Sequence, residues 1–74
     1  MTEFIRLNPK ERVFLIQQAK VNSSRNYHEF ADILGVSRDM IFKYMRGDYL
    51  LPKRIFNILV ELSKFKPENY QTIE

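Results

Sequence analysis

The sequence predicts an all-α fold, a compact four- to five-helix bundle built around a central helix-turn-helix. Apolar residues recur at helical spacing in four segments, and helix-capping residues precede three of them, at Asn8, Asn26 and Ser37. The chain has 74 residues, of which 45% are hydrophobic, with two Gly and three Pro. Because this length supports one small core, we expect a single domain over residues 1–74.

The N-terminal segment has two interpretations. Residues 1–7 carry neither a capping residue nor a helical period, so they could form a short strand or an arm that lies against the bundle. A first helix is predicted to begin after Asn8, because Pro9 suits the first helical position and Glu11 completes the capping pattern. This helix should end near Val21, before a run of Asn and Ser.

Two short helices with a tight turn between them are predicted for residues 26–47. Asn26 and Glu29 form the pattern of a capping box at the start of the first of these helices. Gly35 suits the left-handed residue that ends it, and Ser37 suits the cap of the next helix. Gly47 offers a second stop. These punctuating residues leave a turn of about three residues between the two helices.

A fourth helix is predicted to begin at Pro52, after a short loop over residues 48–51. Its wide apolar stripe consists of Ile55, Phe56, Leu59, Leu62 and Phe65. Pro67 should stop this helix. The tail, residues 67–74, could restart a helix at Pro67, but such a helix would be too short to be stable. We therefore expect either a frayed tail or the start of a longer element.

The residues between about 25 and 65 carry a resemblance to a known family. The positions concerned are Phe30, Ala31, Leu34, Gly35, Val36, Ile41 and Tyr44. With the Arg46-Gly47 pair and the later Pro52, this pattern resembles the helix-turn-helix of the phage-repressor and Cro-type family, the lambda-repressor-like DNA-binding domains. The resemblance implies a repressor-like fold that binds double-stranded DNA and inserts its third helix into the major groove.

The resemblance also implies which side chains contact base edges, namely Arg38, Asp39, Phe42 and Lys43. Arg38 has the fork geometry that binds guanine O6 and N7, and Lys43 can reach guanine or phosphate. Asp39 could accept from cytosine N4 or could instead stabilise the start of its helix. Phe42 could contact a thymine methyl group or cover a gap against a neighbouring helix.

A second group of residues is expected to contact DNA phosphates. These residues lie at the starts of the second and third helices and just after the third: Asn26, Tyr27, His28, Ser37, Arg46, Tyr49 and Lys53. Helix N-termini bind anions through unpaired backbone amides, and phosphate contacts position a protein without specifying sequence.

Composition argues against several other classes of function. The chain has no Cys and a single His, His28, so we expect no metal site, no cofactor and no enzymatic activity. No apolar run is long enough to span a bilayer, so we expect a cytoplasmic protein without a membrane partner. The resemblance to DNA-binding domains implies that it is nucleoid-associated. Twelve Lys and Arg against nine acids give a net charge of +3, compatible with nucleic acid but unexceptional.

The sequence therefore predicts a sequence-specific transcriptional regulator. One alternative is a protein interaction module on the same fold, using Phe42, Tyr49, Leu50 and Leu51. Another is the DNA-targeting module of a larger DNA-processing enzyme. For the regulator we expect a weak homodimer through the fourth helix and the C-terminal tail, whose candidate apolar residues are Ile58, Val60, Phe65, Tyr70 and Ile73.

Overall fold

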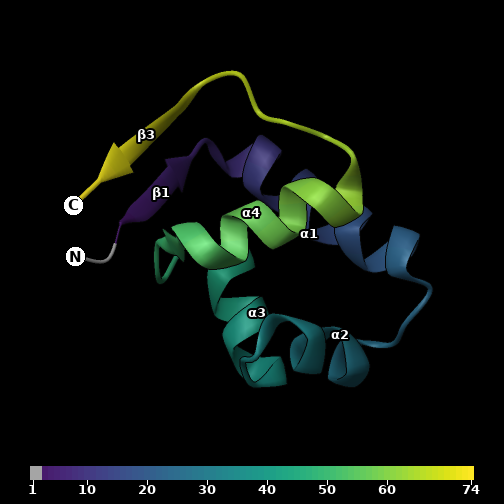
Figure 1. The fold of residues 1–74 in the computed structure, drawn as a ribbon. Coiled ribbons are helices and arrows are strands. Elements are labelled where there is room, and N and C mark those ends of the chain that lie inside the picture. Colours follow the sequence, from purple (N-terminus) through teal and green to yellow (C-terminus); the bar gives the residue numbers. More distant parts are fainter. Residues whose placement is uncertain (1–2) are drawn as a thin grey trace.

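The computed structural model describes residues 3–74 and contains both helices and strands (Figure 1). In chain order the elements are β1 (Phe4–Leu7), α1 (Pro9–Ser23), α2 (Tyr27–Leu34), α3 (Arg38–Arg46), β2 (Leu51–Pro52), α4 (Lys53–Ser63) and β3 (Tyr70–Ile73). The described residues thus form four helices and one three-stranded antiparallel sheet. The fold is mixed α/β, and the predicted all-α bundle is wrong.

β1 is the central strand of the sheet, whose order is β2-β1-β3. Ile5 pairs with Leu51 on one side, and Leu7 pairs with Tyr70 on the other. Ile5 and Leu7 are buried while Arg6 between them is exposed, which is the period of a half-buried strand. Of the two interpretations of residues 1–7, the strand therefore holds for residues 4–7; residues 1 and 2 lie outside the described part of the chain.

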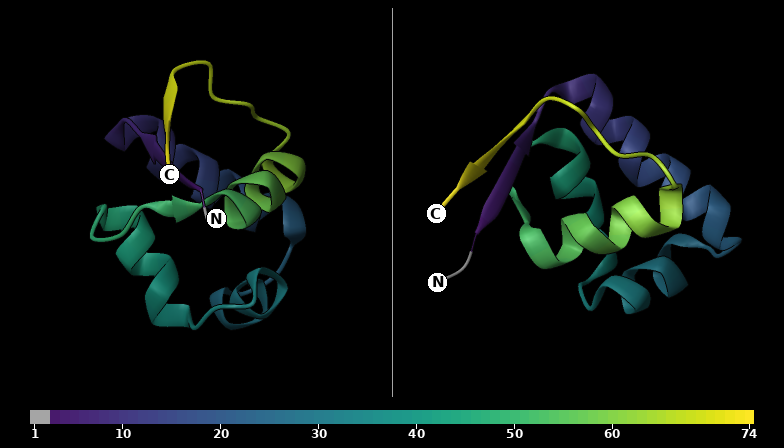
Figure 2. Two further views of the ribbon diagram at one scale, coloured as in Figure 1. Left: turned by 60° about the vertical axis from the view of Figure 1, so that its left-hand side comes forward. Right: turned by 45° about the horizontal axis from the view of Figure 1, so that its top comes forward.

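The tail is neither a frayed end nor the start of a fifth helix. Residues 70–73 form β3, which lies beside β1 in each view (Figures 1 and 2). Tyr70, Thr72 and Ile73 are residue types that favour strands, and the Tyr70 ring packs on Phe56 of α4 with ring centroids 5.0 Å apart. Pairing with β1 gives these few residues the backbone hydrogen bonds that a one-turn helix would leave unmade.

The predicted capping residues begin the first three helices. The Asn8 side chain accepts from the Glu11 amide at 2.8 Å, and the Ser37 hydroxyl accepts from the Met40 amide at 3.2 Å. Asn26 makes both halves of a capping box, at 2.8 Å and 3.4 Å. These three helix starts are confirmed.

The helix ends agree less well with the sequence. α1 continues two residues beyond Val21, to Ser23. Pro52 is the N-cap of α4 rather than its first residue. It also belongs to the edge strand β2, where a residue without a backbone N–H is tolerated. α4 ends at Ser63, before the predicted stop at Pro67, because Lys64 takes a left-handed conformation with φ 57°.

The core lies between the sheet and the helices. α1 and α4 pack against each other and separate the β1–β3 pair from the α2–α3 pair (Figures 1 and 2). The buried apolar side chains are Ile5, Leu7, Leu15, Ile16, Ala19, Phe30, Ala31, Leu34, Ile41, Tyr44, Leu51, Ile55, Phe56 and Leu59. Every helix contributes to this cluster, which fixes α3 with its other side exposed. No helix in residues 3–74 is both long and apolar enough to cross a membrane.

Candidate nucleic-acid interface

The turn between α2 and α3 is fixed by backbone hydrogen bonds to α2 and by a side chain from α4. Gly35 has φ 72°, and the amides of Gly35 and Val36 donate to carbonyls of the last turn of α2 at 3.1 Å and 3.0 Å. Arg54 of α4 donates from Nη1 to the Leu34 carbonyl at 3.2 Å. A cation at the C-terminal end of a helix satisfies its unpaired carbonyls, so α4 fixes the point where the chain leaves α2.

Tyr44 anchors the inner side of α3. Its side chain is 5% exposed and lies in the core cluster. Burial raises the pKa of the Tyr44 hydroxyl above its ordinary value, against a smaller opposing effect from the positive charge of Arg54. A buried tyrosine therefore determines which side of α3 faces outward.

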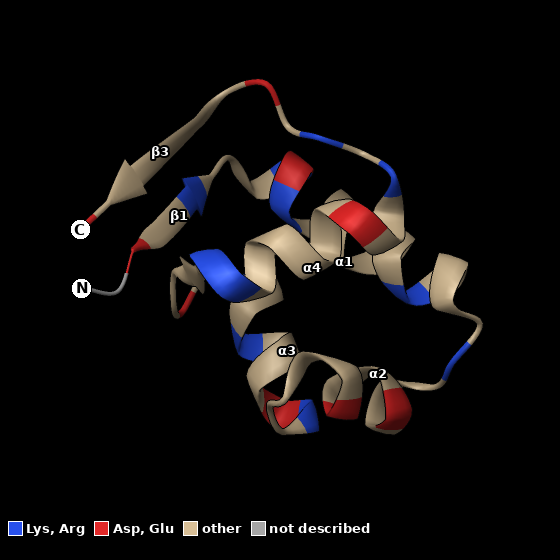
Figure 3. Cartoon of the chain, in the orientation of Figure 1, with Lys and Arg blue, Asp and Glu red and all other residues tan. Residues whose placement is uncertain are grey.

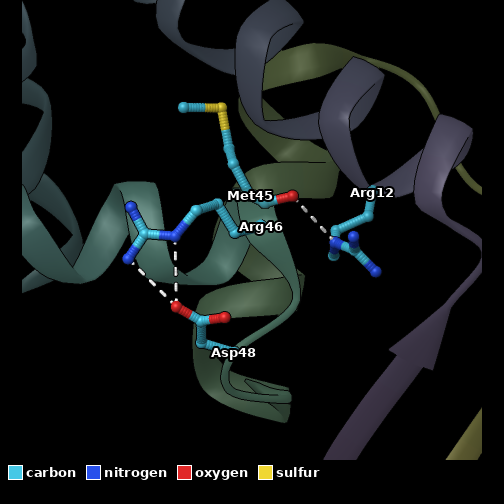
Figure 4. Close-up of polar contacts among 4 residues, drawn as sticks. All are labelled: Arg12, Met45, Arg46 and Asp48. Atoms are coloured by element: carbon cyan, nitrogen blue, oxygen red, sulfur yellow. Dashed lines mark hydrogen bonds and ion pairs between the residues drawn. The ribbon is translucent and has the colours of Figure 1, made fainter.

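The C-terminal end of α3 is also clamped. Arg12 of α1 donates from Nε to the Met45 carbonyl at 3.1 Å (Figure 4). Gly47 follows with φ 86°, and a Cβ atom placed there would lie 2.9 Å from Nη2 of Arg12. Gly47 supplies the left-handed backbone conformation, and a side chain at this position would require the flexible end of Arg12 to move.

The outward face of α3 carries the residues predicted to contact base edges. Arg38 and Asp39 are exposed in its first turn, and Lys43 is half-buried one turn later. Arg38, Asp39 and Phe42 line an open groove of about 430 Å³. The other side of this groove is formed by the start of α2, where the predicted phosphate contacts Asn26, Tyr27 and His28 lie.

Phe42 contacts a neighbouring helix. Its ring lies 5.0 Å from the ring of Tyr27 in α2, with an angle of 47° between the planes. Lys20 of α1 places its Nζ 4.5 Å from the centroid of the same Tyr27 ring. Phe42 thus covers a gap between α2 and α3, one of its two expected roles, and its ring is half-buried.

Several predicted DNA-contacting cations already have partners within the chain. Arg46 binds Oδ2 of Asp48 through Nε at 3.1 Å and Nη2 at 3.0 Å (Figure 4). Lys53 pairs with Glu3 at 3.2 Å. The Nζ of Lys43 lies 5.7 Å from the ring centroid of Tyr49. A DNA phosphate would have to compete with a carboxylate at Arg46 and at Lys53.

The helix pair α2 and α3 is electrically balanced. Its cations are Arg38, Lys43 and Arg46, and its acids are Glu29, Asp32 and Asp39, so the formal net charge is zero. Figure 3 shows acidic and basic segments side by side on these two helices. The excess positive charge of the chain lies on other elements, so electrostatic attraction to DNA would be modest.

Three contributors to this surface were not anticipated from the sequence. Lys20 contacts the Tyr27 ring, Arg54 caps α2, and Asp48 binds Arg46. Arg54 is 20 residues from Leu34, and Lys20 meets Tyr27 from the preceding helix, across the loop between α1 and α2, so no pattern within one helix indicated either contact. Asp48 did carry a signal, because an acid two residues after an Arg across a turn-forming Gly lies within reach of it.

A separate apolar groove of about 440 Å³ adjoins α3 on the side nearest the sheet. It is lined by Phe4, Met40, Tyr44, Asp48, Tyr49, Leu50 and Pro52. The predicted interaction residues Tyr49 and Leu50 are therefore available, whereas Leu51 is 2% exposed and belongs to the core. Within residues 3–74 no group of three or more His, Cys, Asp or Glu is placed to hold a metal ion.

Comparison with protein-family models, with curated proteins and with solved structures found no match to this chain.

Proposed function

We propose that this protein is a DNA-binding protein, a sequence-specific transcriptional regulator of the repressor-like type that acts in the cytoplasm on nucleoid DNA. The observation that supports this proposal best is the outward face of α3. Its first turn presents Arg38 and Asp39 to solvent, while Tyr44 holds the opposite side in the core. A helix held in this way can lie in a major groove with its N-terminal residues on base edges.

Base recognition would depend chiefly on three side chains. Arg38 would donate both arms of its guanidinium to guanine, and Lys43 would reach a neighbouring guanine or a phosphate. Asp39 would accept from cytosine N4, although its place in the first turn of α3 also stabilises the helix. Phe42 would offer a thymine methyl group only the outward edge of its ring.

Phosphate contacts would flank this face. Asn26, Tyr27 and His28 line the groove beside α3, and Ser37 begins α3. Amides at these helix starts favour an anion. Arg46 ends α3, Tyr49 lies on the loop after it, and Lys53 begins α4. The two cations would first have to leave their carboxylate partners.

Because α2 and α3 together carry no net charge, a single domain would bind a half-site weakly. A dimer that contacts two half-sites would supply the affinity that one domain lacks. We place the self-contact at α4 and the tail, as the sequence predicted. β3 is an edge strand of the sheet, and Tyr70 to Ile73 carry neither a charge nor a Pro that would oppose pairing.

A two-fold axis perpendicular to the sheet would pair β3 with β3 of a second copy. Both α2–α3 pairs would then lie on the same side of a continuous sheet. The chain measures 30 × 21 × 20 Å, which is compatible with recognition helices about 34–36 Å apart. Ile58, Val60 and Phe65 are half-buried in one copy and could add apolar contact, although Phe65 already packs edge-on against Phe14.

Binding to random duplex DNA, measured by fluorescence anisotropy at several salt concentrations, tests the proposal. We expect binding at low salt that weakens as salt rises, with little change for Arg38→Ala on random DNA. On the preferred site, Arg38→Ala should lose more affinity than Lys66→Ala. Lys66 is the matched control, because it belongs to the loop between α4 and β3, and that loop lies away from α3 (Figure 1). No binding at low salt would exclude the DNA-binding proposal.

Sedimentation tests the dimer at several protein concentrations, with and without a two-fold-symmetric site. We expect a weak dimer that tightens on such DNA. A strict monomer that binds each half-site independently would contradict the dimer and favour the alternative that the domain targets DNA for a larger DNA-processing enzyme.

The second candidate function is a protein interaction module. The apolar groove beside α3 and the zero net charge of the helix pair favour it. Substituting Tyr49 and Leu50 separates the two functions. An interaction module would lose partner binding, whereas a DNA-binding protein would keep its preference at the base pair that Arg38 contacts.

A further inference from the structure

The two residues that follow Gly47 hold two of the three cations of α3. Asp48 binds the guanidinium of Arg46, and the ring of Tyr49 lies beneath the ammonium group of Lys43. We infer that this pair, Asp48 and Tyr49, sets how strongly α3 binds DNA: Asp48 competes with DNA phosphate for Arg46, and Tyr49 positions Lys43. The inference rests on the proposed DNA-binding function.

The position of Asp48 is fixed by the backbone. The Asp48 amide donates to the Lys43 carbonyl at 3.0 Å, and the Gly47 amide donates to the carbonyls of Lys43 and Tyr44 at 3.1 Å and 3.2 Å. Arg12 holds the same turn from the other side through the Met45 carbonyl (Figure 4). A rigid turn therefore presents a carboxylate to the last cation of the helix.

The Arg46–Asp48 pair is exposed enough to exchange partners. The Arg46 side chain is 61% exposed and the Asp48 side chain is 51% exposed. Nε and Nη2 of Arg46 both donate to the same oxygen, Oδ2, so the other carboxylate oxygen of Asp48 makes no hydrogen bond to Arg46. Because exposed ion pairs are weak, a phosphate can displace Asp48, but the displaced carboxylate then lies beside that phosphate and repels it.

Lys43 and Tyr49 are arranged differently. A cation over an aromatic ring keeps its full charge, and its long side chain loses rotational freedom before DNA arrives. Tyr49 is 52% exposed and lies outside the core cluster, so the protein does not need its ring to fold. Tyr49 is therefore a positioning residue for Lys43.

The test for Asp48 is Asp48→Asn, which keeps the size of the side chain and removes its charge. We expect the affinity for random duplex DNA at low salt to rise by about 1.5- to 5-fold, the range that corresponds to an exposed ion pair. The slope of log affinity against log salt should steepen by about 0.9, as for one additional phosphate contact. Glu68→Gln is the matched control, since it makes the same charge change on the loop before β3.

If Asp48 competes with DNA phosphate for Arg46, the gain in DNA affinity of Asp48→Asn must depend on Arg46. Arg46→Gln should therefore reduce affinity more in the Asp48→Asn protein than in the natural protein, and this comparison remains valid if Asp48→Asn also shifts the melting temperature. For Tyr49, we expect Tyr49→Phe, which keeps the ring beside Lys43 and removes only the hydroxyl, to keep the base preference of the natural protein. Tyr49→Leu should lose preference at the base pair read by Lys43 at an unchanged melting temperature.

The outcomes distinguish this inference from the proposed function. If the natural protein binds random duplex and Asp48→Asn gains no more than Glu68→Gln, the role of Asp48 is overturned while DNA binding stands. Equal base preference for Tyr49→Leu and Tyr49→Phe overturns the role of Tyr49. If neither the natural protein nor Asp48→Asn binds duplex DNA at low salt, both the inference and the proposed function fail.

Discussion

Replacing Gly47 with alanine tests whether Arg12 holds the C-terminal end of α3. Gly47 has φ 86°, and a Cβ atom at this position would lie 2.9 Å from Nη2 and 3.0 Å from Cζ of Arg12. The new methyl group therefore has two separate effects. It strains the backbone, and it displaces the guanidinium whose Nε donates to the Met45 carbonyl.

Both effects can be given a magnitude. A left-handed conformation costs a residue with a Cβ atom about 1–2 kcal/mol. A hydrogen bond from a charged group contributes up to about 1.5–3 kcal/mol, so Gly47→Ala should lower the free energy of unfolding by roughly 2–5 kcal/mol. A domain of this length has a free energy of unfolding of about 4–11 kcal/mol, so the effect would be large.

Urea denaturation of five proteins, namely the natural protein, Gly47→Ala, Gly35→Ala, Arg12→Met and the double variant, measures the two contributions separately. Gly35→Ala is the matched control, because Gly35 has φ 72° but its nearest neighbour, Nη1 of Arg54, would be 3.8 Å from the new Cβ. It should lose only the backbone contribution, about 1–2 kcal/mol. Gly47→Ala should cost a similar amount when Arg12 has first been replaced by Met, which keeps an apolar stem without the guanidinium.

The reasoning would be refuted by equal losses for Gly47→Ala and Gly35→Ala. It would also be refuted if the Arg12→Met background left the cost of Gly47→Ala unchanged, because Arg12 would then have no part in it.

Three further predictions concern separate parts of the chain. Arg38→Ala should lower affinity for the preferred DNA site by about 1–3 kcal/mol and change random DNA binding little; equal weakening in a titration would make Arg38 a phosphate contact. Asn26→Ala should lower the free energy of unfolding by about 1 kcal/mol in urea, and an unchanged midpoint would contradict the capping box. The hydroxyl pKa of Tyr44 is higher in the folded state than in the unfolded chain, so the unfolded chain loses the hydroxyl proton at a lower pH. The free energy of unfolding should therefore fall as pH rises from about 10 through the folded-state pKa. Thermal melts of Tyr44→Phe should show a smaller loss over that window, and equal losses would exclude this cause.

The helix starts were predictable because their signals are local. Asn26 and Glu29 are three residues apart, and the Ser37 hydroxyl binds an amide three residues ahead. The C-terminal end of α4 and the strand β3 could not be predicted from local signals. Lys64 takes a left-handed conformation without the Gly that usually indicates one, and Tyr70 pairs with Leu7 from the other end of the chain.

The candidate site shows the same division. Helical periodicity placed Arg38 and Asp39 outward and Ile41 inward, and the structure confirms these positions. Their roles in DNA binding stay predictions. Sequence spacing could not show that Arg54 caps α2, since the two residues involved are 20 positions apart. Such contacts depend on how the helices pack, which no short window of sequence contains.

The central place of β1 in the sheet has a consequence for folding kinetics. The capped helices depend on local contacts that form quickly, whereas β1 must meet β3 across almost the entire chain, with Phe4 opposite Ile73. Closing so long a loop costs entropy before any strand pairing compensates for it. We therefore expect the β1–β3 pairing to form last and to open first, so that amide hydrogen exchange in β3 is fast compared with that in α1 and α4.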